Sequence, residues 1–192
     1  MSKVAIQGNA SGTGTFTIAA PNSNSNQTLT LPDVTGTVVT TGSTGGVTQA
    51  MLASGVAGNG PAFRATRSTT FNPSGSTWTK VPLNSENFDT NNNFDNATNY
   101  RFTPTVAGYY QINTHAFATG SPPECYVALY KNGSNVAYSL FNGSGTGQWT
   151  GMVSDVWDAN GTTDYFEMYV WTSASSPAIS GMYMSGFMAR SA

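Results

Sequence analysis

The sequence predicts an all-β protein, an antiparallel sandwich or jelly roll, and three observations lead to this fold class. From residue 61 onwards, short runs of alternating apolar and polar residues follow one another at regular spacing, as in strands with one buried face. Turn-forming pairs lie between them: Asn132-Gly133 is favoured in two-residue hairpins, and Asn160-Gly161 predicts another turn. No part of this region has the periodicity of a long helix.

The predicted strands of this region cover residues 62–66, 77–83, 99–103, 109–118, 126–131, 136–141, 147–158, 165–171 and 181–189. The stretch YRFTPTVAGYYQI, residues 100–112, is the most informative. Its first strand is stopped by Pro104, Gly108 allows the chain to turn, and an apolar strand resumes at Tyr109. We expect a hairpin there.

The first 46 residues form an arm that differs from the rest of the chain. Short alternations of apolar residues with Thr, separated by Gly, Pro and Asn, predict small strands without a core of their own. The arm must therefore pack on other copies or on another protein. Its candidate docking residues are Val4, Ile6, Phe16, Ile18, Leu29 and Leu31. Residues 47–60 form either a loose linker or a short helix capped by Thr48 and ended by Gly55.

Composition limits the classes of partner. Only 8% of the residues are charged, with 7 Lys and Arg against 9 Asp and Glu, so no basic patch for nucleic acid can be assembled. Hydrophobic residues make up 39% and aromatic residues 12%, which is enough to fold residues 61–192 as a head. No run approaches the roughly 18 apolar residues of a membrane span. Without a secretory signal, we expect synthesis in the cytoplasm of a host.

Catalytic patterns are scarce, and we predict neither an enzyme nor a cofactor site. His115 alternates with apolar residues on a strand, which favours a hydrogen-bonded structural role over a Cys-His pair with Cys125. A weak calcium candidate places oxygen side chains at every second position, but Phe94 and Tyr100 stand where a helix-loop-helix calcium site needs Gly and Glu. A surface loop that hydrogen-bonds its own backbone explains the pattern better. The calcium candidates are Asp89, Asn91, Asn93 and Asp95.

Two late segments, residues 165–171 and 182–188, are apolar on both faces. One face of an antiparallel sheet normally meets water, so such strands need a second cover. A neighbouring subunit can supply it, and the alternative is a long loop of the same chain, such as residues 121–125. The sequence thus predicts an obligate oligomer. The candidate interface residues are Tyr165, Tyr169, Trp171, Met182, Met184 and Phe187.

The stretch at residues 100–112, together with PAFRATR at residues 61–67, KNG at residues 131–133 and YMSGFM at residues 183–188, resembles the globular head of the first complement component. Relatives of that family include the tumour-necrosis-factor-like cytokines. The resemblance covers residues 61–192 and implies a jelly roll of about ten strands that works as a homotrimer.

Residues 12–42, GTGTFTIAAPNSNSNQTLTLPDVTGTVVTTG, are similar to segments that precede such heads in virion proteins of tailed phages. We therefore expect a non-enzymatic virion protein. About 60 residues precede the head, and even fully extended they would span less than about 200 Å, which is too short for a long fibre shaft. This length favours a capsid decoration or cement trimer.

The alternative function is a receptor- or carbohydrate-binding head of a tail fibre or tail tip that contacts a host surface glycan, with Trp149, Trp157 and Trp171 as candidate sugar contacts. A polysaccharide-degrading enzyme that uses Asp155 or Asp158 is a third, weaker hypothesis.

Overall fold

The structure, a computed structural model, describes residues 11–15, 17, 22–26, 28, 60–119, 124–142, 147–174 and 177–192. The chain divides into two compact units, residues 1–38 and residues 39–192. The described residues of the first unit are exposed, and there the amide of Ser25 donates a hydrogen bond to Ser23 Oγ. Of the expected linker or helix at residues 47–60, residues 47–59 lie outside the described residues. So do the docking candidates Val4, Ile6, Phe16, Ile18, Leu29 and Leu31.

The second unit contains the head, and its described residues form strands and no helix. The strands are β1 (Ala62–Thr66), β2 (Thr79–Lys80), β3 (Ser85–Asp89), β4 (Phe94–Asp95), β5 (Arg101–Phe102), β6 (Gly108–Thr119), β7 (Glu124–Lys131), β8 (Ser134–Asn142), β9 (Gln148–Ala159), β10 (Phe166–Thr172) and β11 (Ala178–Ser191). Within the described ranges there is accordingly no helix long and apolar enough to cross a membrane.

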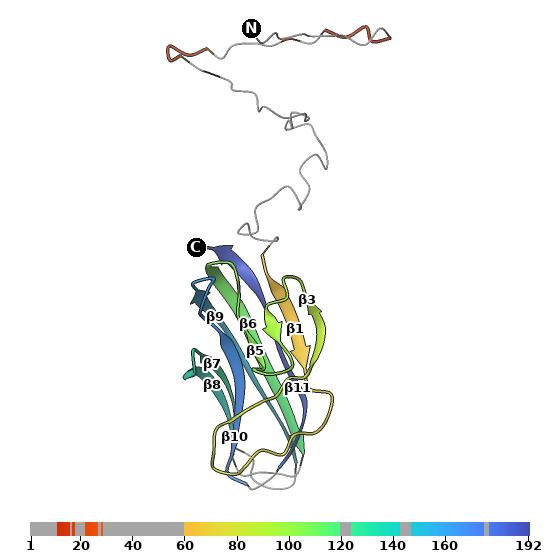
Figure 1. Cartoon of the computed structure of the whole chain (residues 1–192), viewed down its shortest axis with the longest axis vertical. Coiled ribbons are helices and arrows are strands. Elements are labelled where there is room, and N and C mark those ends of the chain that lie inside the picture. Colours follow the sequence, from red (N-terminus) through yellow and green to blue (C-terminus); the bar gives the residue numbers. More distant parts are fainter. Residues whose placement is uncertain are drawn as a thin grey trace. The chain divides into compact units, whose positions relative to one another are not determined.

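Two antiparallel sheets face each other in the head (Figure 1). The first sheet has the strand order β3-β1-β11-β6-β9, and the second has the order β4-β5-β10-β7-β8, with β2 paired to β10. Neighbouring strands in space are mostly distant in sequence, and only the β7–β8 and β4–β5 pairs join consecutive strands. The predicted all-β antiparallel sandwich is confirmed.

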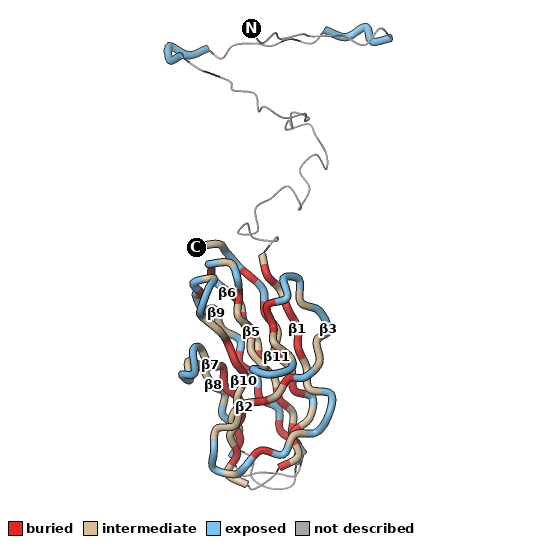
Figure 2. The backbone as a smooth tube through the Cα atoms, in the orientation of Figure 1, coloured by how far each residue is buried: buried red, intermediate tan, exposed pale blue. Residues whose placement is uncertain are grey.

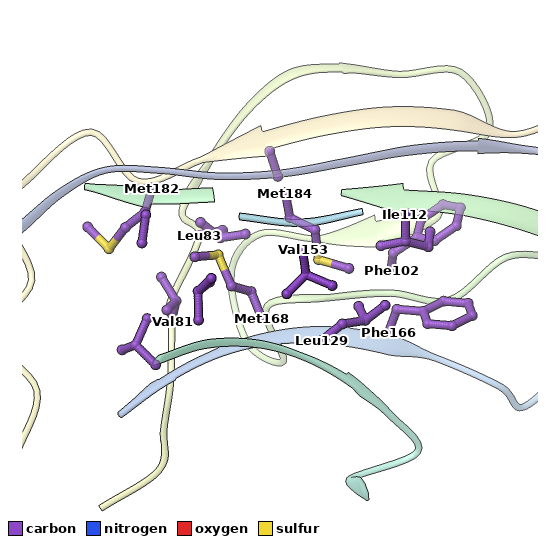
Figure 3. Close-up of a cluster of buried hydrophobic side chains, with 14 of the residues drawn as sticks. Val81, Leu83, Phe102, Ile112, Leu129, Val153, Phe166, Met168, Met182 and Met184 are labelled. Atoms are coloured by element: carbon purple, nitrogen blue, oxygen red, sulfur yellow. The ribbon is translucent and has the colours of Figure 1, made fainter. Parts of the chain in front are cut away.

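The core lies between the sheets. Buried residues alternate with more exposed ones along β6, β9 and most of β11 (Figure 2), whereas β7 and β10 contain runs of consecutive buried residues. In β6, Tyr110, Ile112, Ala116 and Ala118 are fully buried. Figure 3 shows how side chains from both sheets meet in this layer. Those labelled are Val81, Leu83, Phe102, Ile112, Leu129, Val153, Phe166, Met168, Met182 and Met184.

The predicted hairpin at residues 100–112 is wrong. β5 pairs with β10 in the second sheet whereas β6 belongs to the first, so the chain crosses between the sheets at residues 103–107. The hydroxyl of Tyr110 donates to the carbonyl oxygen of Val106 within this crossing, at 2.6 Å. Gly108 is needed for a different reason than a turn, since an added Cβ would lie 2.5 Å from the carbonyl oxygen of Arg190.

Two other local predictions have different outcomes. Asn132 and Gly133 join β7 to β8 with φ values of 53° and 77°, the two positive angles that a two-residue hairpin requires. The strand predicted at residues 77–83 is reduced to the two-residue β2. Val81 and Leu83, which follow it, are buried but belong to no strand.

The first and last strands of the head meet at one end of it. β1 and β11 pair antiparallel, and the amide of Met188 donates to the carbonyl oxygen of Pro61 at 3.0 Å. Met188 also packs so closely on Gly60 that a Cβ there would lie 2.3 Å from its methyl carbon. The start of the head is therefore fixed against the final strand.

Candidate functional surfaces

The outward face of the first sheet carries large apolar side chains. Across β11, β6 and β9, Phe187 is opposite Gln111 and Gln111 is opposite Val156, so two apolar side chains flank one amide. Phe187 is 51% exposed and Val156 is 50% exposed. We call this surface the apolar face, and its members are Phe88, Tyr109, Met152, Val156, Tyr183 and Phe187.

The polar residues between these side chains are mostly uncharged and bond to one another. The side-chain amide of Gln111 donates to Ser154 Oγ at 3.0 Å and to Asn113 Oδ1 at 3.3 Å. Because these groups are already paired within the face, covering them with another protein removes few free hydrogen-bonding groups from water. The face can therefore be buried at a low polar cost.

His115 lies on the apolar face and is held by its neighbours. Its Nδ1 is 2.9 Å from the carbonyl oxygen of Gly181, its Nε2 is 2.9 Å from Thr150 Oγ1, and its ring stacks on Tyr183 with 4.6 Å between centroids. Nδ1 must donate to the carbonyl, so His115 is positioned by hydrogen bonds as a structural residue.

The structure does not bring Cys125 and His115 together as a pair. Cys125 is fully buried between the sheets, and burial raises the pKa of its thiol to about 12. His115 instead points outward from the first sheet. A thiol that is protonated and enclosed at neutral pH does not act as a nucleophile.

The carboxylates considered for polysaccharide cleavage are also engaged. Asp155 accepts hydrogen bonds from the amide of Val156 and from the indole of Trp157, and Asp158 forms an ion pair with Lys131 at 2.8 Å.

The predicted interface residues separate onto the two sheets. Met182 is 1% exposed and Met184 is 0% exposed, so both side chains lie in the core of a single head and cannot form a subunit interface. The alternation along β11 turns Tyr183 and Phe187 outward instead. Tyr169 and Trp171 lie on β10 in the second sheet, and Tyr165 immediately precedes that strand.

The outward face of the second sheet is partly covered by its own chain. Tyr169 stacks on Tyr130 with 3.9 Å between ring centroids, and Trp171 meets Tyr126 edge-on at 5.3 Å. Trp78, which lies before β2, contacts both Tyr126 and Tyr130. This aromatic cluster is therefore half-buried within one subunit, and on β8 Tyr138 remains 62% and Leu140 44% exposed.

The three tryptophans proposed as sugar contacts do not gather at one site. Trp149 is buried in the core at 2% exposure, and Trp157 packs against the core while its indole bonds to Asp155. Trp171 belongs to the aromatic cluster of the second sheet. The tryptophans thus form no common sugar-binding platform.

The side chains of the calcium candidates form hydrogen bonds within their own loop and its surroundings. Asp89 accepts from the amides of Asn91 and Phe94, and Asp95 accepts from the amides of Ala97, Thr98 and Asn99. These bonds, led by those from Thr98 and Ala97, lower the pKa of Asp95 to about 2. In the described part of the chain, no three His, Cys, Asp or Glu residues form a group that could hold a metal. The loop matches the self-bonded alternative.

Sequence reasoning missed a polar hollow beside this loop. It has a volume of about 620 Å³ and lies where the loop from β3 to β5 meets the start of the crossing to β6. The only advance signal was the density of Asn residues before Arg101. Its lining residues are Glu86, Asn92, Asn93, Phe94, Asp95, Asn96, Asn99, Arg101, Thr103 and Thr105.

Comparison with known proteins defines the class of fold. No protein family matches the chain, and no curated protein is similar to it in sequence. Solved structures do match: the globular domain of zebrafish complement 1qA gives a TM-score of 0.57 with 19% identity, covering 69% of this chain and 99% of that one. Murine APRIL gives 0.55 with 7% identity, covering 67% and 98%.

A third similar structure is the Eiger TNF protein from S. frugiperda, with a TM-score of 0.52 and 7% identity, covering 69% of this chain and 92% of that one. The class is thus an antiparallel jelly roll. More particularly, the head has the fold of the complement-head and tumour-necrosis-factor-like domains, as the sequence motifs indicated.

Proposed function

We propose that this chain is a non-enzymatic structural protein of a tailed-phage virion: a homotrimeric capsid decoration or cement protein that docks by its N-terminal arm and displays the jelly-roll head. The observation that carries the proposal is the apolar face. Monomeric soluble proteins rarely leave large contiguous apolar patches exposed, and such patches mark interaction surfaces.

The occupant of the apolar face is another copy of the head. Burying a half-exposed side chain such as Phe187 or Met152 contributes roughly 1 kcal/mol. In a closed ring every subunit takes part in two contacts, so these gains add up around the ring and offset the entropy lost on association. The resemblance of residues 61–192 to complement heads supports three as the number of copies.

The two sheets therefore have different roles. In the second sheet Trp78 packs on Tyr126 and Tyr130, whereas within the described residues no ring contact covers Met152, Val156 or Phe187 of the first sheet. This asymmetry supports placing the subunit contact on the first sheet and leaving the second sheet outward.

The arm supplies the attachment in this proposal. Its similarity to segments of phage virion proteins, and its short apolar alternations, support docking on capsid subunits. A cement protein that binds only the assembled shell stabilises that shell by mass action. The length of the arm favours a position close to the particle surface.

Counting copies in purified virions by quantitative mass spectrometry tests the proposal. A decoration protein is expected at high copy number and on capsids separated from tails. A few copies per particle, found only on tails, would instead establish the alternative, a receptor- or carbohydrate-binding head of a tail fibre or tip. The observation that favours this alternative is the polar hollow.

A further inference from the structure

The polar hollow has walls that are fixed before any ligand arrives. Asp95 Oδ1 accepts from Thr98 at 2.8 Å and from Ala97 at 3.0 Å, and its Oδ2 accepts from both the amide and the side chain of Asn99. On the other side, Asn93 Oδ1 accepts from the amide of Thr105 at 3.2 Å. A site with preformed walls loses little conformational entropy on binding.

Several polar side chains in the hollow have no partner of their own. Within the described residues, no hydrogen bond engages the carboxylate of Glu86 or the side-chain amides of Asn92 and Asn96. The guanidinium of Arg101 lies over the ring of Tyr165 at 4.3 Å and makes no side-chain hydrogen bond there either. One small volume thus holds free donors and free acceptors.

One residue next to the hollow has an unusual backbone conformation. Tyr100, which precedes the lining residue Arg101, has a φ of 51°, in the left-handed region that bulky residues rarely adopt, whereas Asn92 has a φ of 54°, which Asn tolerates. Such conformations cost free energy, persist where the surrounding structure enforces them, and cluster at ligand-binding sites. They support a functional interpretation of this loop.

Charge selects the class of ligand. Burial, followed by the nearby negative charges of Asp89 and Asp95, raises the pKa of Glu86. Arg101 is the only cation among the residues that line the hollow. An anionic ligand would meet repulsion there, whereas a neutral ligand rich in hydroxyl groups can both donate to Glu86 and accept from Asn96 and Arg101.

We propose that the polar hollow formed by Glu86, Asn92, Asn96 and Arg101 binds a neutral saccharide. Sugar hydroxyls are donors and acceptors at once, which matches the mixed free groups of the wall. The hollow is lined from the β3–β6 loops and shares no residue with the apolar face. The proposal therefore stands whether or not the head is a trimer or a capsid protein.

Saturation-transfer NMR on the full chain tests this inference, because it observes the ligand and tolerates a large protein. The probes are galactose, rhamnose and N-acetylglucosamine, with glucuronic acid as the anionic probe and calcium chloride alone as a separate titration. The variants are Glu86→Gln and Asn96→Ala. The matched control is Tyr138→Ser, on the exposed edge of the second sheet.

At least one neutral sugar is expected to bind, at least tenfold more tightly than glucuronic acid. Affinity should fall at least tenfold in both hollow variants and stay unchanged in the control, with equal thermal unfolding midpoints in all four proteins. The inference is overturned if no neutral sugar binds, if binding survives both variants, if Tyr138→Ser abolishes it, or if only calcium responds to Glu86→Gln.

Discussion

Tyr110 donates a 2.6 Å hydrogen bond from its hydroxyl to the carbonyl oxygen of Val106, four residues earlier, where the chain leaves the second sheet and enters the first. The tyrosine ring is fully buried and meets Phe102 edge-on at 5.7 Å. One side chain thus joins β5 of the second sheet, the crossing segment and β6 of the first sheet. This bond, together with the hydrogen bonds that the amides of Thr103 and Thr105 donate to Asn93, holds the crossing.

Replacing Tyr110 with Phe should lower the free energy of unfolding by about 1–2 kcal/mol, because the carbonyl of Val106 loses its partner in a partly buried place. Denaturant unfolding followed by fluorescence measures the change. Tyr109→Phe is the control, since Tyr109 is 46% exposed and should leave stability unaltered. Equal stability of the Tyr110 variant and the natural chain would show that the bond does not hold the crossing.

Phe187→Glu should dissociate the proposed trimer without unfolding the head. The side chain is 51% exposed, so a carboxylate is solvated in a single subunit but becomes buried and unpaired in a subunit contact. Sedimentation velocity at micromolar concentration should show one chain for Phe187→Glu and three for Tyr138→Ser. A Phe187→Glu protein that still sediments as a trimer would remove the first sheet as the interface.

Asp95→Asn should lower the free energy of unfolding at neutral pH and make this free energy less dependent on pH in the acid range. The folded pKa of about 2 lies below the ordinary aspartate pKa of 3.8, so ionised Asp95 stabilises the fold above pH 3.8, and this contribution is lost as the pH falls toward 2. Denaturant unfolding at pH 7 and pH 2.5 should show that the free energies of unfolding of the variant and the natural chain differ less at the lower pH.

The control for this pH experiment is Glu124→Gln, whose exposed carboxylate makes no hydrogen bond within the described residues. The role assigned to the Asp95 hydrogen bonds would be contradicted if the difference in free energy of unfolding between Asp95→Asn and the natural chain stayed constant over the whole pH range.

Gly161→Ala should lower the free energy of unfolding by more than about 2 kcal/mol. Gly161 has a φ of 73°, and an added Cβ would lie 2.4 Å from the backbone nitrogen of Ala107, which cannot move aside as a flexible side chain can. Thermal unfolding compares this variant with Gly147→Ala, where a Cβ meets nothing within 4 Å. Similar midpoints for the two variants would refute the steric argument.

The thiol of Cys125 should resist modification in the folded protein. Burial raises its pKa to about 12 and removes it from solvent, so a thiol reagent such as DTNB should react at neutral pH only after denaturant is added. Rapid reaction without denaturant, at a rate near that of a free thiol, would show that the sheets open around Cys125 far more often than this structure implies.

The long strands were predictable because their alternation is unambiguous. In β6 and β9, buried residues alternate with more exposed ones at almost every position. Asn132 and Gly133 favour positive φ angles, and this preference fixes the hairpin between β7 and β8. β3 and β4 were missed because SENFD and FD read as polar loop, and only their pairing with β1 and β5 makes them strands.

The candidate site was less predictable than the fold because it depends on which residues face outward and on long-range packing. Met182, Tyr183 and Met184 are all apolar, so the sequence could not decide which of them enter the core. In the structure Met184 lies opposite Thr114 of β6, and the side chains of both methionines are buried in the core. Likewise, nothing in the local pattern showed that Trp78 would contact Tyr130, or that Arg101 and Glu86 would line the same hollow.

The contact between Met188 and Pro61 also makes the head a candidate for circular permutation. A short peptide could join Ala192 to Gly60, and new ends could be opened in the exposed Asn132-Gly133 hairpin. The N-terminal arm would then be attached to the edge strand β8 instead of to β1. Only the covalent link between β7 and β8 would be lost, and every strand pairing in both sheets would stay intact.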